Sequence, residues 1–298
     1  MAFRFRRKET VANAFRRITR EQTAAVISLL ADRGGDLKER IHDARRRIKK
    51  LRSLLHLVRS EWDPPSFDKH NIGLRNAARR LSRARDAEVS LACFETITRR
   101  LPKEECSKVH QLLLDANRQA RRHGITPAQL AAIAAEVRKH GHAIAETSFE
   151  HDGWLLFAPG LARGYRRTRR MRRDVKQSPA PPTLHEWRKR VKRLQFQMEL
   201  LTRALAKPEC KIANLLKKLG TELGEHRDLH ILKCTLDEYA AHGVAAAQSE
   251  PIQQAIARSS ANRLRRIQKL ARSTFCGRTK AFLSAVHRAW KKWHAGNR

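Results

Sequence analysis

The chain has 298 residues, enough for one large domain or two of ordinary size, and 41% of them are hydrophobic. It carries 64 Lys and Arg residues against 29 Asp and Glu, a formal net charge of +35. Apolar residues recur throughout at helical spacing, which excludes a disordered tail. Because so large an excess charge repels itself in a compact fold, we expect a polyanionic partner: nucleic acid, inorganic polyphosphate or an anionic membrane surface.

The cysteines and the N-terminal residues indicate the cellular compartment of the protein. The five cysteines are far apart and include no C-x-x-C pair, so neither a zinc ribbon nor a disulfide framework is indicated. The first ten residues, MAFRFRRKET, lack the apolar stretch of a signal peptide, and no run of about 18 apolar residues occurs. We therefore expect a cytoplasmic protein that does not insert into a membrane.

The predicted elements are helices from one end of the chain to the other, which makes the expected fold all-α. Ala, Leu, Arg, Lys and Glu are abundant, and no segment alternates polar and apolar residues as a strand does. Breaks separate about ten helices, several of them 20 to 30 residues long, as in helix bundles. In chain order the breaks fall at Gly34-Gly35, Pro64-Pro65, Pro102, Pro127, Gly153, Pro159, the run from Pro179 to Pro182, Pro208, Pro251 and Gly277.

The chain contains an internal repeat. IHDARRRIKKLRSLLHLVRS and LHEWRKRVKRLQFQMELLTR align without a gap, with His42 matching His185, and two weaker similarities accompany them. The paired segments are 41–60 with 184–203, 74–89 with 215–231, and 14–20 with 164–170. We expect a single domain made of two similar helical halves, about 1–150 and 151–298.

Each copy of the strongest repeat forms an amphipathic helix with a basic stripe. At 100° per residue the apolar residues share one arc, which can pack in a bundle, and the basic residues share the opposite arc. A solvated helix face usually mixes Glu with Lys at i,i+4, but these stripes hold almost no acidic residues. The pattern favours a binding face over a solvated one. The candidate residues are His42, Arg45, Arg46, Lys49, Arg52, His185, Arg188, Lys189 and Lys192.

A third basic segment runs from Arg163 to Arg173 and has seven arginines in eleven positions. Several of them share one side of a predicted helix, and the first half of the chain has counterparts near residues 14–20. If the halves pair about a pseudo-twofold axis, all of these faces converge on one basic groove. The further candidates are therefore Arg166, Arg170, Arg173, Arg16 and Arg20.

Two arginines differ from the others in the motif. Arg47 and Arg190 fall at the border of the apolar arc, so we expect a structural role for them. The hypothesis is that they pair with Asp86 and Asp228 on the next helix of each half.

The repeated motif resembles that of the CHAD (conserved histidine α-helical domain) family, whose pattern is close to H-[DE]-x-R-x-x-x-[RK]-[RK]-x-R, occurring twice. The first copy, from His42 to Arg52, is a full match, and the second, from His185, departs only at Gln195. The resemblance implies an all-α fold of two four-helix bundles with pseudo-twofold symmetry. It also implies non-catalytic binding of inorganic polyphosphate in a basic cavity or groove, with a less basic second half-site.

The resemblance also implies an enzyme as a possible partner of the chain. Family members can be fused to a CYTH triphosphatase domain, whose E-x-E-x-K signature is absent here. A polyphosphate-metabolising enzyme would therefore be a separate partner. Granule targeting, sensing and scaffolding all remain open as roles, with polyphosphate granules as one location within the cytoplasm.

The rival functions have weaker signals. Non-specific binding of RNA or single-stranded DNA is the main alternative, although the stripes hold one aromatic residue, Phe196, on which a base could stack. We find no Walker A loop, nucleophile elbow or paired-carboxylate motif, so we expect no enzyme. Glu222, His226 and His230 have metal-like spacing, but a solvated face is the commoner meaning, so we expect no metal or cofactor. A motif histidine can either donate to phosphate or position the bundle, and both roles stay open.

Overall fold

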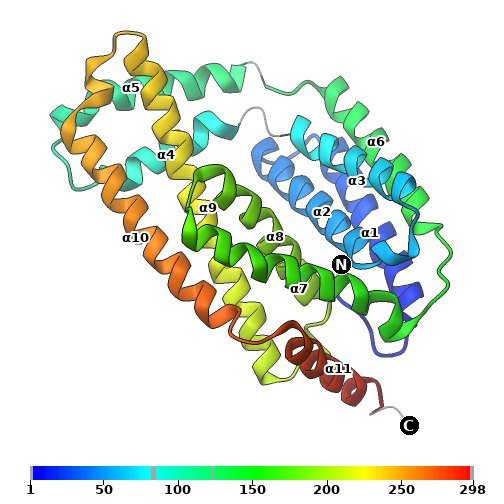
Figure 1. The fold of residues 1–298 in the computed structure, drawn as a ribbon. Coiled ribbons are helices and arrows are strands. Elements are labelled where there is room, and N and C mark those ends of the chain that lie inside the picture. Colours follow the sequence, from blue (N-terminus) through cyan, green and yellow to red (C-terminus); the bar gives the residue numbers. More distant parts are fainter. Residues whose placement is uncertain (1–2, 82–84, 123, 296–298) are drawn as a thin grey trace.

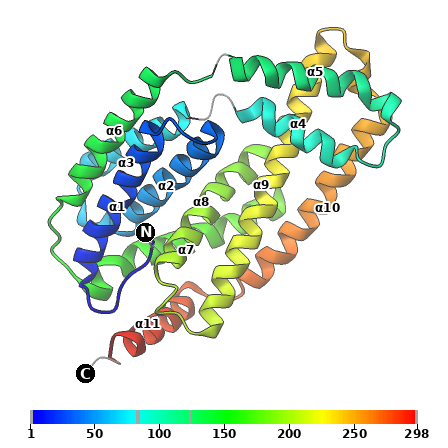
Figure 2. The same ribbon diagram turned by 180° about the vertical axis from the view of Figure 1, so that it is seen from behind.

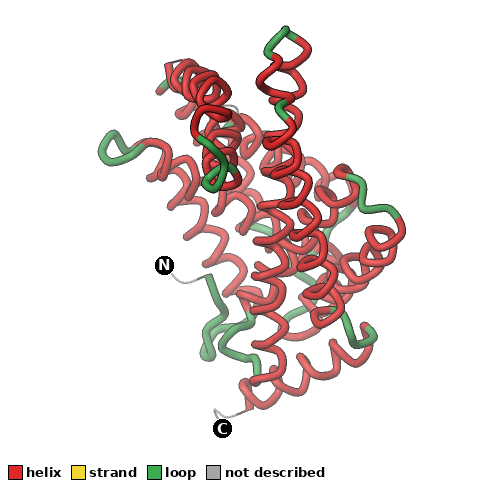
Figure 3. Tube along the Cα trace, turned by 90° about the vertical axis from the view of Figure 1, so that its left-hand side faces the viewer, coloured by secondary structure: helices red, strands yellow, loops and turns green. Residues whose placement is uncertain are grey.

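A computed structural model describes residues 3–81, 85–122 and 124–295, and over these ranges every regular element is a helix (Figures 1 and 3). The all-α prediction is confirmed. The α-helices are α1 (Val11–Ala31), α2 (Leu37–Leu57), α3 (Pro64–Arg80), α4 (Arg85–Ile97), α5 (Lys103–Arg122), α6 (Pro127–Ala145), α7 (Gly153–Gln177), α8 (Pro181–Leu200), α9 (Lys207–Ala241), α10 (Glu250–Thr274) and α11 (Thr279–Ala295). Two short 3-10 helices are η1 (Arg59–Glu61) and η2 (Ala245–Gln248).

Most helices begin where the sequence predicts a break. Pro64 is the first residue of α3, and the side chain of Asp63 before it accepts a hydrogen bond from the backbone N–H of Ser66. At the start of α6, Thr126 and Gln129 form a reciprocal capping box around Pro127. Proline suits a first turn because its missing N–H would have no helical partner there.

One predicted break between helices is wrong. Pro159 lies inside α7 and does not break it. The N–H that Pro159 lacks would have bonded to the carbonyl of Leu155, whose residue is 64% exposed, so water can take its place. The paired segments 74–89 and 215–231 differ in structure, because α3 ends at Arg80 within the first, whereas the second lies within the continuous α9.

The helices pack in two groups that meet along α2 (Figures 1 and 2). In the first, α1 packs against α2 and α6, and α3 packs against the same two helices. In the second, α7, α8, α9 and α10 pack in sequence, with α11 against α7. Helix α2 contacts α8 and α7, which joins the groups. The pseudo-twofold relation between two four-helix bundles stays a prediction, as does the division near residue 150.

Two hydrophobic cores hold the described residues together. The larger continues from α1–α3 and α6 through α7 and α8 to α11, and Phe15, Leu55 and Trp187 are almost completely buried in it. The smaller lies where α4 and α5 cross the far ends of α9 and α10, around Phe94 and Leu232 (Figure 2). Within the described ranges, no helix combines the length and the hydropathy needed to cross a bilayer.

Candidate functional site

The two motif helices, α2 and α8, contact each other through their second halves. Ser53 Oγ donates a hydrogen bond to the backbone carbonyl of Arg193 at 2.8 Å. Lys50 Nζ of α2 lies 2.6 Å from Glu199 Oε1 of α8. This contact fixes how the two copies of the motif sit relative to each other.

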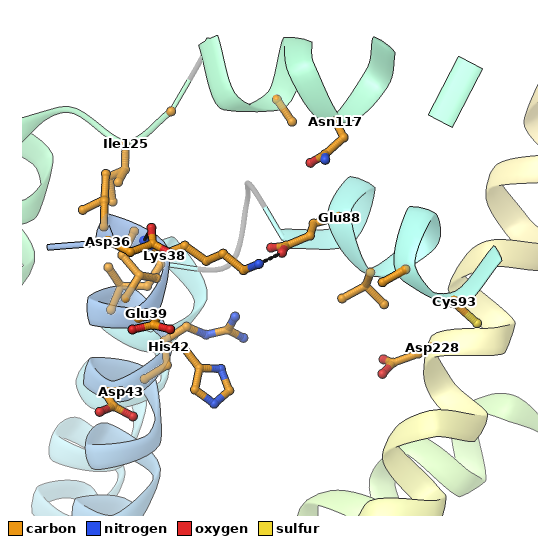
Figure 4. Close-up of a pocket in the computed structure, with 18 of the residues that line it drawn as sticks. Asp36, Lys38, Glu39, His42, Asp43, Glu88, Cys93, Asn117, Ile125 and Asp228 are labelled. Carbon is orange, nitrogen blue, oxygen red and sulfur yellow. Dashed lines mark hydrogen bonds and ion pairs between the residues drawn. The ribbon is translucent and has the colours of Figure 1, made fainter. Parts of the chain in front are cut away.

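The start of the first copy lines a large cavity of about 1780 Å³ between α2, α4, α5, α6, α9 and α10 (Figure 4). His42 points into it from α2 and Asp228 from the opposite wall on α9, while Lys38 is ion-paired with Glu88. Arg45 also belongs to the lining. The acidic residues of the lining are Asp36, Glu39, Asp43, Glu88, Glu225 and Asp228. The cavity is therefore of mixed charge and is not the purely basic groove that the stripes suggest.

The second copy faces α9 directly. A Cβ on Gly220 would lie 3.1 Å from Lys192 Cδ, and one on Gly224 would lie 3.4 Å from Arg188 Nε, so two glycines allow these basic side chains to lie close to α9. His185 lines a separate pocket of about 320 Å³ between α8 and α9. Burial, followed by the positive charges around it, lowers the pKa of His185 to about 4. The two motif histidines thus line different cavities.

The remaining motif residues are more exposed. Arg46 is exposed and lies 3.3 Å from Asp43, one turn away on the same helix. Lys189 is exposed and lies 3.3 Å from Glu186 in the matching position of α8. Lys49 is half-buried. In each copy, the acidic residue of the motif and the basic residue three positions later therefore neutralise each other.

The predicted residues outside the motif lie on α7 and α1. Arg166, Arg170 and Arg173 are exposed along α7. On α1, Arg16 lies over the ring of Phe149, and Arg20 lies 2.8 Å from Glu146 of the same half. Arg20 therefore differs from its counterpart Arg170, because a carboxylate holds Arg20 and no ion pair holds Arg170 within the described residues.

A basic cluster lies next to the contact between α2 and α8. We call it the arginine cluster, and its members are Arg52 and His56 of α2, Arg190 and Arg193 of α8, and Arg167 of α7. Arg52 Nε donates a hydrogen bond to Asn71 Oδ1 of α3 at 3.0 Å. His56 Nε2 is buried and finds no hydrogen-bond partner among the described residues.

The charges in the arginine cluster oppose each other. Burial, followed by the charge of Arg75, lowers the pKa of Arg52 to about 10. Burial, then the charges of Arg52 and Arg190, lowers the pKa of Arg193 to about 10. Burial, then the charges of Arg193 and Arg52, lowers the pKa of His56 to about 2, so its ring is neutral at physiological pH. An anion at this position would relieve the repulsion.

Sequence reasoning placed Arg52 in the candidate site but missed most of its neighbours. Arg190 and Arg193 belong to the second copy of the motif, and Arg167 belongs to the arginine-rich segment. The sequence therefore indicated all three as basic but did not bring them together. What was missing is the direction of α7 and α8 relative to α2, which a helical wheel drawn for one helix does not contain.

The predicted pairing of Arg47 and Arg190 with the two aspartates is wrong. Arg47 Nη1 donates to Gln22 Oε1 of α1 at 3.2 Å. Arg190 Nε lies 3.6 Å from Glu186, one turn earlier on its own helix. The partner of Arg47 is on the preceding helix and that of Arg190 is on its own helix, so neither pairs with the helix that follows.

The metal-like row on α9 is occupied by other contacts. Glu222 lies 2.9 Å from Arg263 of α10, and His226 Nε2 lies 3.2 Å from Ser260 Oγ. Within the part of the chain that the structure describes, no group of three or more His, Cys, Asp or Glu side chains is arranged to hold a metal ion.

Fold and site together define a class: an all-α protein in which two basic motif helices pack side by side. The family model described as "CHAD domain" matches residues 10–237, so the chain belongs to the CHAD family. The crystal structure of the CHAD domain from the plant Ricinus communis is similar to it, with 18% sequence identity, a TM-score of 0.58, and coverage of 96% of this chain and 95% of that one. At this identity the likeness shows the fold. No curated protein matches the chain.

Proposed function

We propose that the chain binds inorganic polyphosphate and does not hydrolyse it. The observation that carries the proposal is the arginine cluster, where the half-buried Arg52 of α2 and the half-buried Arg190 and Arg193 of α8 lie near the exposed Arg167 of α7. Polyphosphate has a negative charge on every unit and no bases, so its best receptor is a dense field of arginine and lysine.

The proposed binding residues are those of the two motif stripes together with the exposed arginines of α7 and their counterparts on α1. Membership of the CHAD family supports this ligand. We also propose that the two halves are related by a pseudo-twofold axis that passes between α2 and α8. The packing of α1, α2, α3 and α6 in one group and of α7 to α10 in another is consistent with it.

Nucleic acid is the second candidate, because a net charge of +35 attracts any polyanion. It has less support at the arginine cluster. Phe196, the aromatic residue of the stripes, is 7% exposed and packs edge-on against Phe3, so it is not available to stack on a base.

The test is a competition titration at physiological salt with polyphosphate and single-stranded DNA of matched charge, read by calorimetry. We expect long polyphosphate to displace the DNA, because base stacking adds nothing to the DNA complex. Equal competition would favour general nucleic-acid binding. Phosphate release from polyphosphate by the pure protein would contradict the absence of catalysis.

A second measurement addresses the stripes. Replacing Arg45, Lys49, Arg188 and Lys192 together by Glu should abolish polyphosphate binding, while the helical circular dichroism spectrum is retained. If the affinity survives, the stripes are not the binding residues.

A further inference from the structure

The two sides of the contact between α2 and α8 differ in charge. On one side, Lys50 of the first copy is ion-paired with Glu199 of the second at 2.6 Å. The gap-free repeat matches Lys50 with Arg193 and Glu199 with His56. On the other side the equivalent pair is therefore Arg193 and His56, and a neutral imidazole stands where the first side has a carboxylate.

The helices that flank the contact repeat this difference. Arg17 of α1 lies 2.5 Å from Glu9 and 3.1 Å from Glu21. In the 14–20 repeat its counterpart is Arg167 of α7, and one residue beyond that repeat Met171 matches Glu21. No ion pair holds Arg167 within the described residues, and partial burial with the charge of Arg163 lowers its pKa.

Glu186, the carboxylate that acts on the arginine cluster, is already shared. Glu186 acts on both Arg52 and Arg193, but it also lies 3.3 Å from Lys189 and 3.6 Å from Arg190. Four cations therefore depend on a single negative charge. Three of these cations are half-buried, and cations that share one carboxylate in this way lower the stability of the fold, so the arrangement is explained by an anion that is bound there.

We propose that the chain holds a phosphate oxyanion on one side of its repeat only, between Arg193, Arg52 and Arg167. The forked guanidinium groups of these residues donate to the phosphate oxygens, and the bound phosphate takes the place that Glu199 and Glu21 occupy on the opposite side. The inference rests on the proposed function, since the oxyanion is a unit of the polyphosphate chain. It makes the site asymmetric although the sequence motif occurs twice.

The test is to give the basic side the carboxylate that the other side has. The variant His56→Glu installs the counterpart of Glu199 next to Arg193. We expect the affinity for polyphosphate of defined length, measured by calorimetry, to fall by about tenfold or more, because the new carboxylate competes for the guanidinium donors. The melting temperature without ligand should rise, because the new ion pair relieves the repulsion.

The charge-matched control is Ala261→Glu. Ala261 is exposed on α10, which packs against α9 and α4 and away from the cluster. This variant adds the same charge, and we expect its affinity to stay within about twofold of the wild type. Equal losses in His56→Glu and Ala261→Glu would overturn the one-sided site and leave only general charge attraction.

A position-matched pair covers the case in which His56→Glu does not fold. Arg193→Gln and Lys50→Gln remove one cation each from matched positions of the repeat. We expect Arg193→Gln to weaken polyphosphate binding by about tenfold and Lys50→Gln to have an effect below about twofold. Losses of the same size would contradict the proposal. Failure of the wild type to bind polyphosphate would instead defeat the proposed function, so the two failures are distinguishable.

Discussion

At the scale of single residues, the chain keeps several histidines neutral inside a strongly basic fold. The pKa of His56 is lowered to about 2 and that of His185 to about 4, in each case first by burial and then by nearby cations. In the unfolded chain both return to the ordinary value of 6.5. The difference between the two states links folding to proton uptake.

This linkage predicts how stability depends on pH. As pH falls from 7 to 5, the unfolded chain takes up protons on these histidines and the folded chain does not, so the free energy of unfolding falls. The stabilising contribution of the neutral His56 is fully present above pH 6.5. It decreases as pH falls below that value and is lost completely near pH 2. We expect a lower melting temperature at pH 5 than at pH 7 by scanning calorimetry. His56→Gln should reduce that difference, and an unchanged difference would show that His56 is already protonated in the fold.

Sequence reasoning reached the residues of the motif but not their electrostatic pairing. It could place His42, Arg45 and Arg52 on one face, because that follows from helical periodicity alone. It could not tell that Lys50 pairs with a carboxylate while the charge of Arg193 acts on the imidazole of His56. Those neighbours come from the other half of the chain, and their identity depends on how the halves pack.

At the scale of helices, a glycine sets the distance between α7 and α2. A Cβ on Gly160 would lie 1.8 Å from the backbone carbonyl oxygen of Leu57 and 2.5 Å from its carbon. Backbone atoms at the end of α2 cannot rotate away as a side chain can. The position therefore accepts no side chain unless α7 moves.

We predict that Gly160→Ala destabilises the protein by about 2 kcal/mol or more, because α7 must shift away from α2. It should also weaken polyphosphate binding, since Arg167 moves with α7. Denaturant unfolding and calorimetric titration measure the two effects. Gly277→Ala is the control, because no atom lies within 4 Å of its added Cβ. Equal stability of the two variants would mean that α7 is not held by this contact.

Helix boundaries were predictable where local chemistry decides them. Asp63-Pro64 and Thr126-Pro127 start helices because a side-chain cap and a proline agree at one position. Pro159 misled the prediction, since a proline ends a helix only when nothing else satisfies the carbonyl that it leaves free. The apolar pattern alone also could not show that α3 ends at Arg80.

At the scale of the whole molecule, the smaller core joins segments from opposite halves. Helix α4 packs against α9 and α10, and α5 packs against α4 and η2. Phe94, Val109 and Leu232 are almost fully buried in this core. Apolar periodicity predicts that one face of each helix is buried but not which helix covers it. This crossing was therefore outside the reach of the sequence, whereas the all-α class and the basic character were not.

The smaller core predicts separate local unfolding. Phe94→Ala should cost about 3–5 kcal/mol within that core and expose amides of α4 and α5 first. Hydrogen exchange read by mass spectrometry should show protection lost in those helices and retained in α1 and α2. Phe15→Ala in the larger core is the comparison, and we expect the reverse order. Uniform loss of protection in Phe94→Ala would mean that the two cores unfold as one.

Helix α9 has a consequence for the large cavity. It runs without interruption for 35 residues, about 50 Å at 1.5 Å per residue, with its first part against α8 in the larger core and its last part in the smaller one. Between these two parts, Glu222 and His226 contact Arg263 and Ser260 of α10. Asp228 lies in the same stretch, on the cavity wall opposite His42 (Figure 4). We therefore expect the wall that faces His42 to keep its position when a ligand enters the cavity. On this expectation, the cavity would select a ligand by its fixed dimensions and would not close around it.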